Sequence, residues 1–240
     1  NRPEVQTQIP IGNDFELLVN PFPILPLHFT IPAKMHQPQL IREHYDKMRQ
    51  LLDRFEQLTV FYNGPKCGAS APDHMHLQAG MGSHLPVRDN WDMLYSNRQT
   101  LLVTQDGAEL AALTNYACPA FAIIANNADT DAQLFETLYQ ALPQREDETE
   151  PMFNILKWRH NNMFITVVIP RDKHRPACYS AEGDAQMLIS PGALDMGGLI
   201  ITPRKEDFDR LDTPLLEALF KEVGMPQNTF EEVKQKVANP

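Results

Sequence analysis

Residues 61–80 read FYNGPKCGASAPDHMHLQAG, and this stretch says most about the fold and chemistry of the chain. Its second part alternates polar and apolar residues, as a strand with one buried face does. One strand face would then carry His74, His76 and Gln78, and the other Met75, Leu77 and Ala79. The apolar face can pack on a core. The polar face, with two imidazoles and an amide, suits chemistry better than packing.

A loop of small residues precedes this strand. Gly64, Gly68 and Ser70 carry little side-chain bulk, so that backbone N–H groups can approach an anion. We therefore expect a phosphate-binding loop directly upstream of the two histidines.

The composition indicates a globular, acidic protein. Of the 240 residues 42% are hydrophobic, which is enough for a core, and the apolar runs are far too short to span a membrane. The net charge of -10 argues against nucleic acid or an anionic membrane surface as the main partner. It leaves room for a phosphorylated small molecule in a local basic pocket. The oligomeric state is not indicated.

Cysteine usage and the first residues bear on the compartment. Cys67, Cys118 and Cys178 are an odd number at wide spacing, which does not predict a disulfide framework. We therefore expect a cytoplasmic protein. The opening Asn1-Arg2-Pro3 is not a basic-then-apolar leader, and we interpret it as a cut inside a longer protein.

The spacing of apolar residues predicts an α+β fold. Strands are expected at residues 15–19, 27–32, 58–63, 101–104, 109–113 and 120–124. Helices are expected at residues 39–55 and 131–142. Residues 143–151 are polar and acidic, which predicts a solvated linker.

A local pattern occurs twice. The pattern Ile-Pro-x-x-x-His-x-Pro begins at Ile31 and again at Ile169, and it places His36 and His174 in corresponding positions. We interpret this as two tandem related halves, residues 1–145 and 146–240. The second half has no His-x-His motif, so the first half alone would carry a nucleophile.

Three interpretations of the His74-x-His76 pair compete. The pair can be structural. It can bind a metal such as zinc, since two histidines on one strand face are common ligands, but no further ligand is placed by spacing. It can also supply a neutral imidazole that attacks phosphorus, which needs a donor for the developing oxygen charge. Gln78 offers such a donor and the upstream loop a phosphate cradle, so the combination favours the nucleophile.

Four segments together resemble one family. NPFPILPLH at residues 20–28, IPAKMH at 31–36, NGPKCGAS at 63–70 and HMHLQ at 74–78 are similar to the histidine-triad superfamily in its transferase branch. That branch holds galactose-1-phosphate uridylyltransferase, diadenosine tetraphosphate phosphorylase and GDP-galactose phosphorylase, and the whole also resembles uncharacterised bacterial members. Glutamine at the third triad position is typical of the transferases, where the small hydrolases have histidine. The resemblance implies an antiparallel sheet with helices.

The resemblance also implies roles by position. His76 would attack the α-phosphorus of a nucleotide, with His74 supporting the site and Gln78 binding a non-bridging oxygen. The ribose and base would lie between Asn20 and Phe22. The second phosphate or leaving group would be held by a set of loop residues with two nearby cations, namely Asn63, Gly64, Lys66, Gly68, Ser70 and Arg171.

The resulting hypothesis is a nucleotidyltransferase or phosphorylase that acts on a nucleoside diphosphate derivative, such as a nucleotide sugar or a dinucleoside polyphosphate. A covalent nucleotidyl-histidine would be resolved by phosphate or a sugar phosphate. No cofactor or catalytic metal is expected, although the resemblance allows a structural zinc. The alternatives are a metal-dependent hydrolase that uses the same histidines and a catalytically idle nucleotide-binding module.

Overall fold

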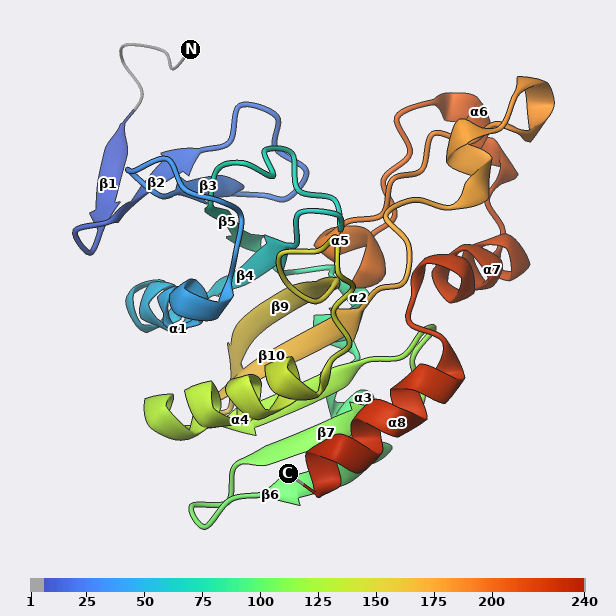
Figure 1. Cartoon of the computed structure of the whole chain (residues 1–240). Coiled ribbons are helices and arrows are strands. Elements are labelled where there is room, and N and C mark those ends of the chain that lie inside the picture. The colour runs from blue at the N-terminus through green and yellow to red at the C-terminus, as the bar shows by residue number, and fades with distance from the viewer. Residues whose placement is uncertain (1–6, 240) are drawn as a thin grey trace.

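The computed structural model describes residues 7–239, so the prediction made for Asn1-Arg2-Pro3 lies outside the described residues. Its strands form one antiparallel sheet in the order β1-β2-β3-β5-β4-β9-β10-β8-β7-β6 (Figure 1). Their bounds are β1 Gln8–Ile11, β2 Phe15–Val19, β3 Phe29–Pro32, β4 Leu58–Asn63, β5 His76–Met81, β6 Arg98–Val103, β7 Glu109–Leu113, β8 Phe121–Ala125, β9 Phe153–His160 and β10 Met163–Pro170. The predicted α+β class with an antiparallel sheet is confirmed.

Helices cover both faces of the sheet. The α-helices are α1 Tyr45–Arg54, α2 Pro86–Asp89, α3 Trp91–Ser96, α4 Ala128–Ala141, α5 Ala193–Met196, α6 Lys205–Arg210, α7 Thr213–Val223 and α8 Gln227–Ala238. Short 3-10 turns occur at η1 Arg42–His44, η2 Ala177–Ser180 and η3 Gly183–Ala185.

Two apolar clusters hold these layers together. The larger one joins α1, α4 and α8, which lie on the near face in Figure 1, to strand residues such as Val60 and Leu77. The second joins α3, α5 and α7 to the opposite face, which includes Phe61 and Trp158. Alternation along β4 therefore places neighbouring residues on different faces, as the strand geometry requires.

The sequence placed the helix starts imprecisely. The helix predicted at 39–55 begins later, with the 3-10 turn η1 and then α1. Gln39 lies before it, and its side chain donates to the backbone of Asn63 in β4. The helix predicted at 131–142 begins earlier, at Ala128, since the Asn127 side chain caps it by accepting from two backbone N–H groups. The segment 143–151 is not solvated throughout, because Glu150 is only 2% exposed.

The strand order repeats itself. Read from each edge inward, β1-β2-β3-β5-β4 and β6-β7-β8-β10-β9 share one order, with α1 and α4 in matching connections. The echo at Ile31 and Ile169 does not follow this match, because Ile31 lies in β3 and Ile169 in β10. The sheet is continuous across the predicted boundary at residue 145, since β8, which precedes it, pairs with β10, which follows it. Whether residues 1–145 and 146–240 are separate domains stays a prediction.

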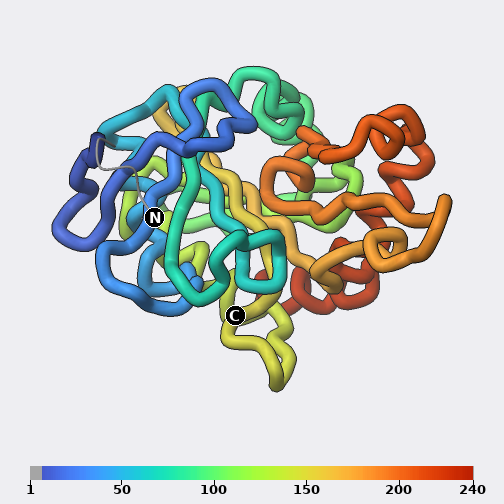
Figure 2. The backbone as a smooth tube through the Cα atoms, turned by 90° about the horizontal axis from the view of Figure 1, so that it is seen from above, coloured from blue at the N-terminus to red at the C-terminus, as the bar shows by residue number. Residues whose placement is uncertain are grey.

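The segment after β10 extends the fold on one side. Figure 2 shows it in orange to red beside the sheet. It has a small apolar cluster of its own, built on Met187, Ile189 and Leu219. Within residues 7–239 no helix is long and apolar enough to cross a membrane.

Candidate functional site

His76 opens β5 and is only 6% exposed. Its Nδ1 lies 2.8 Å from the backbone carbonyl oxygen of His74. A carbonyl only accepts, so Nδ1 carries the proton and Nε2 keeps a free lone pair. Nε2 is buried and has no hydrogen-bond partner among the described residues. Burial lowers the pKa of His76, which favours the neutral imidazole that a nucleophile requires.

Gln78 lies on the same face of β5, opposite Phe61 of the second cluster. Its Oε1 is 2.8 Å from Nε2 of His28. The backbone N–H of Ile24 donates to Nδ1 of His28 over 3.0 Å, so the His28 proton must be on Nε2 and is donated to Gln78. Burial also lowers the pKa of His28. The amide nitrogen of Gln78 is thereby turned away from His28, and it can donate to a ligand oxygen.

The turn at residues 20–28 flanks this pair. Asn20 Oδ1 accepts from the backbone N–H of Phe22 over 2.9 Å, and Asn20 Nδ2 lies 3.5 Å from His28 Nε2. Phe22 is 83% exposed. The structure thus brings Asn20 next to the His28–Gln78 pair and leaves the Phe22 ring outside the core.

His74 does not lie in the strand, contrary to the predicted shared face. The strand begins at His76, and the Nε2 of His74 is 2.7 Å from the carbonyl oxygen of Ala33. Its ring meets that of His36 edge to face at 5.2 Å, and His36 pairs with the exposed Asp73. His74 therefore contacts the His76 ring with its backbone carbonyl oxygen and not with its imidazole.

The glycine loop packs against a loop of the C-terminal segment. Gly68 has a φ of +93°, and a Cβ built there would lie 2.8 Å from the Cα of Gly192. A Cβ on Gly64 would lie 3.0 Å from the carbonyl oxygen of Phe153. Ser70, at the end of the loop, is exposed. Cys67 is fully buried, and burial raises the pKa of its thiol to about 12, which disfavours the thiolate that a nucleophilic cysteine requires.

Asn63 joins the two loops. Its Oδ1 accepts from the backbone N–H of Ala193 over 2.6 Å and from the Asn154 amide over 2.9 Å. Asn154 also donates to the carbonyl oxygen of Cys67. Asn63 therefore orders the loop rather than presenting its side chain freely to a phosphate.

Arg171 and Lys66 are also engaged with the protein. All five N–H donors of Arg171 have acceptors, which are Asn154 Oδ1 and the carbonyl oxygens of Pro191, Lys173, His174 and Val223. Arg171 is 4% exposed, so this geometry supports a structural role instead of the predicted phosphate contact. Lys66 Nζ pairs with Asp147 over 2.6 Å at the surface, where both side chains are partly exposed.

The residues around His76 do not fit a zinc site. His74 Nε2 is directed at a carbonyl, and His36 at Asp73. Across residues 7–239 no group of three histidine, cysteine or acidic side chains is arranged to hold a metal ion. The predictions about cofactors stay untested.

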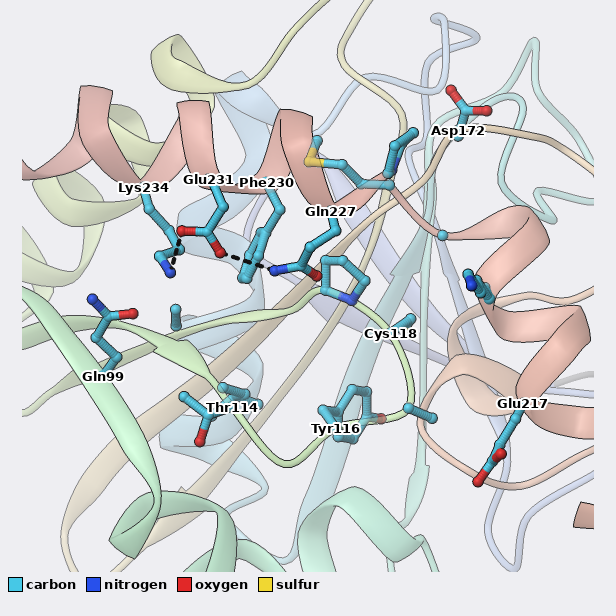
Figure 3. A pocket seen from close by; sticks show the side chains of 18 of the residues that line it. Gln99, Thr114, Tyr116, Cys118, Asp172, Glu217, Gln227, Phe230, Glu231 and Lys234 are labelled. Carbon is cyan, nitrogen blue, oxygen red and sulfur yellow. Dashed lines mark hydrogen bonds and ion pairs between the residues drawn. The ribbon is translucent and has the colours of Figure 1, made fainter. Parts of the chain in front are cut away.

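The cavity in Figure 3 lies elsewhere. Its volume is about 730 Å³, and it is lined by α7, α8 and the end of β7, with Tyr116, Glu217 and Phe230 among its residues. None of the predicted site residues lines it. In the predicted site His76 is buried, whereas Phe22 and Ser70 are exposed.

Two buried amide side chains contact the predicted site residues but were not predicted from the sequence. Asn154 has a weak signal, since it is an amide among the apolar residues at the start of β9. Gln39 has none, because nothing nearby in sequence shows that it reaches His76.

Comparisons with known proteins agree with this fold. Residues 1–81 match the family described as "Domain of unknown function (DUF4922)". No curated protein matches the chain. The solved structure of yeast Ap4A phosphorylase Apa2 is similar, with a TM-score of 0.61 at 20% identity over 90% of this chain and 73% of that chain. The same yeast enzyme in complex with Ap4A gives 0.64 at 21% identity, over 90% and 75% of the two chains.

A bacterial structure is similar as well. A DUF4931 family protein from Bacillus cereus matches with a TM-score of 0.51 at 18% identity, over 89% of this chain and 99% of that chain. At such identities the structural matches show the fold. The predicted resemblance to the transferase branch of the histidine-triad superfamily is confirmed. Residues 93–240, more than half of the chain, match the family described as "GDPGP1-like, C-terminal domain", and the chain therefore belongs to the GDPGP1-like family.

Proposed function

We propose that the protein is a nucleotide phosphorylase or nucleotidyltransferase that forms a covalent bond between His76 Nε2 and the α-phosphorus of its substrate. One observation carries this proposal. His76 has one ring nitrogen fixed by a carbonyl and the other buried without a partner in the described chain, at a pKa that burial lowers. An orphaned buried acceptor is costly in a purely structural histidine.

The neighbours of His76 suit phosphoryl chemistry. Gln78, oriented by His28, would donate its amide N–H to a non-bridging oxygen as charge develops there. Gly64 and Gly68 would let backbone N–H groups approach the departing phosphate, and Ser70 would add a hydroxyl donor. Asn20 would lie beside the ribose.

The reaction has two balanced steps. His76 Nε2 forms a P–N bond, and the bond from the α-phosphorus to the bridging oxygen breaks, so that its electron pair leaves with the phosphate-containing product. In the second step an oxygen of inorganic phosphate or a sugar phosphate attacks the same phosphorus. The P–N bond breaks, its electrons return to Nε2, and a nucleoside diphosphate or nucleotide sugar leaves.

The comparisons support the substrate class. The yeast relative is named an Ap4A phosphorylase, and its structures include complexes with AMP and with Ap4A. A nucleoside diphosphate derivative is therefore our proposed substrate, with phosphate or a sugar phosphate as acceptor. Base and sugar specificity are left to the assay.

Labelling tests the proposal directly. The protein is incubated with nucleotides that carry label on the α-phosphorus, and acid-labile, base-stable label is measured on the protein. We expect labelling of the wild type and none in His76→Gln. His84→Asn is the matched control, because His84 is exposed and its φ of +73° is one that asparagine tolerates. Equal labelling of His76→Gln and the wild type would refute the mechanism.

A further inference from the structure

Strands β4 and β5 separate at the end where His76 lies. Their ladder runs from Leu58 opposite Met81 to Phe61 opposite Gln78. Continued in the same register, it would place Asn63 opposite His76. The ladder ends before these two residues, so they are not paired in it, and buried backbone groups left alone are costly.

The side chain of Gln39 fills this position. Its Nε2 donates to the carbonyl oxygens of Asn63 and His76, each over 3.0 Å. Its Oε1 accepts from the backbone N–H of His76 over 2.7 Å. The three partners are backbone groups with fixed roles, so the orientation of the amide is determined. Gln39 is 0% exposed.

The segment that carries Gln39 runs along the approach to β5. The carbonyl oxygen of Gln37 accepts from Met75 over 2.8 Å, and the Gln39 N–H donates to Pro72 over 3.3 Å. The backbone on both sides of His74 is thus held from one segment. His74 supplies the carbonyl that fixes the His76 proton, so the same segment governs the position of that carbonyl.

We propose that Gln39 is a positioning residue for catalysis, whose amide replaces the missing β4–β5 ladder bonds and thereby holds His76 with Nε2 free. This role rests on the nucleophilic function proposed for His76. Because Asn63 also binds Ala193, the amide further links the nucleophile to the loop of the C-terminal segment. Any residue without two donors and one acceptor would lose part of this arrangement.

The test compares Gln39→Met with Gln37→Met in the full chain. The two glutamines lie in one segment, but only Gln39 has a side chain with a hydrogen bond among the described contacts. Gln37 contacts Met75 through its backbone carbonyl alone, which methionine keeps. Nitrogen NMR of labelled histidines, assigned with His76→Gln, reports the His76 tautomer without any substrate. The rate of covalent labelling and the nucleotide concentration at half-saturation are measured in parallel, and thermal unfolding reports folding.

We expect a single Nδ1–H tautomer in the wild type and in Gln37→Met, and a mixture in Gln39→Met. Labelling of Gln39→Met should be slower by about tenfold or more, with half-saturation changed by less than about threefold, since misplacement affects the reaction more than binding. An unchanged tautomer with a labelling rate within about twofold of the wild type would overturn the proposal.

Two further results are distinguishable. If the wild type is never labelled, the proposed function fails, while the tautomer comparison still decides the role of Gln39. If Gln39→Met does not fold, Gln39→Glu takes its place, because it keeps the acceptor for the His76 N–H and removes the amide donors. A Gln39→Glu protein with the wild-type tautomer and labelling rate would equally overturn the proposal.

Discussion

Replacing Gly68 by alanine tests whether contact between the two loops builds the site. The substitution has two separate effects. The φ of +93° is unfavourable for any residue with a Cβ, and such a conformation costs about 1–2 kcal/mol. In addition the new Cβ would lie 2.8 Å from Gly192 Cα and 3.3 Å from the carbonyl oxygen of Pro191, so backbone must move.

Gly107 separates the two effects. Its φ is +84°, and a Cβ built there meets no atom within 4 Å. Gly107→Ala should therefore lower the free energy of unfolding by the backbone cost alone, about 1–2 kcal/mol. Gly68→Ala should lower it further, by about 1–3 kcal/mol, as overpacking does.

The assays are denaturant unfolding and covalent labelling. We expect Gly68→Ala to be the less stable variant and to be labelled at least about tenfold more slowly, because the loop that we propose to hold the departing phosphate shifts. Gly107→Ala, which lies in a distant hairpin, should be labelled at the wild-type rate. Equal stability losses and equal labelling in the two variants would refute the inferred contact between Gly68 and Gly192.

Three other predictions concern buried polar groups. Burial raises the pKa of Glu150 to about 7, so in the folded protein this carboxyl keeps its proton to a higher pH than in the unfolded chain. The free energy of unfolding should therefore fall by about 3 kcal/mol from pH 4.5 to pH 7. In urea titrations, Glu150→Gln should make this fall smaller. Asp131→Asn, which breaks the fully buried pair with Lys157, should cost about 3–5 kcal/mol in denaturant unfolding, and adding Lys157→Met should recover part of it. His28→Asn should slow labelling by about tenfold or more, because Gln78 loses its orienting donor; unchanged labelling would contradict this.

The local sequence patterns predicted those strands well whose bounds depend on their own residues and on the adjoining turns. The strands at 58–63 and 109–113 have the predicted bounds, since apolar residues run up to a turn at each end, and residues 58–63 are also rich in β-branched and aromatic residues. The face that carries His76 and Gln78 also follows from the period of two. His74 was placed wrongly in the strand because Ala33, 41 residues away, supplies its acceptor.

The roles of residues whose hydrogen-bond partners lie far away in the sequence could not be predicted from local patterns. Arg171 follows a strand and is well suited to bind phosphate, yet carbonyl oxygens from three separate parts of the chain surround its guanidinium. Gln39 has no motif, and its role depends on where β4 and β5 separate. Such contacts join residues that lie far apart in the sequence, so neither spacing nor composition reports them.

The repeated strand order and the sequence echo match different strands, because the echo relates β3 to β10 whereas the strand order relates β5 to β10. By strand order β5 corresponds to β10, so the position of His76 at the start of β5 corresponds to that of Met163 at the start of β10. The second set of strands thus has no imidazole at this place. It contributes from the centre of the sheet instead, where Asn154 of β9 lies opposite Asn63 of β4 and donates to its side chain. The site is therefore built at the junction of the two strand groups, and a variant such as Asn154→Leu should disturb the loop of Gly68 although it lies outside every histidine motif.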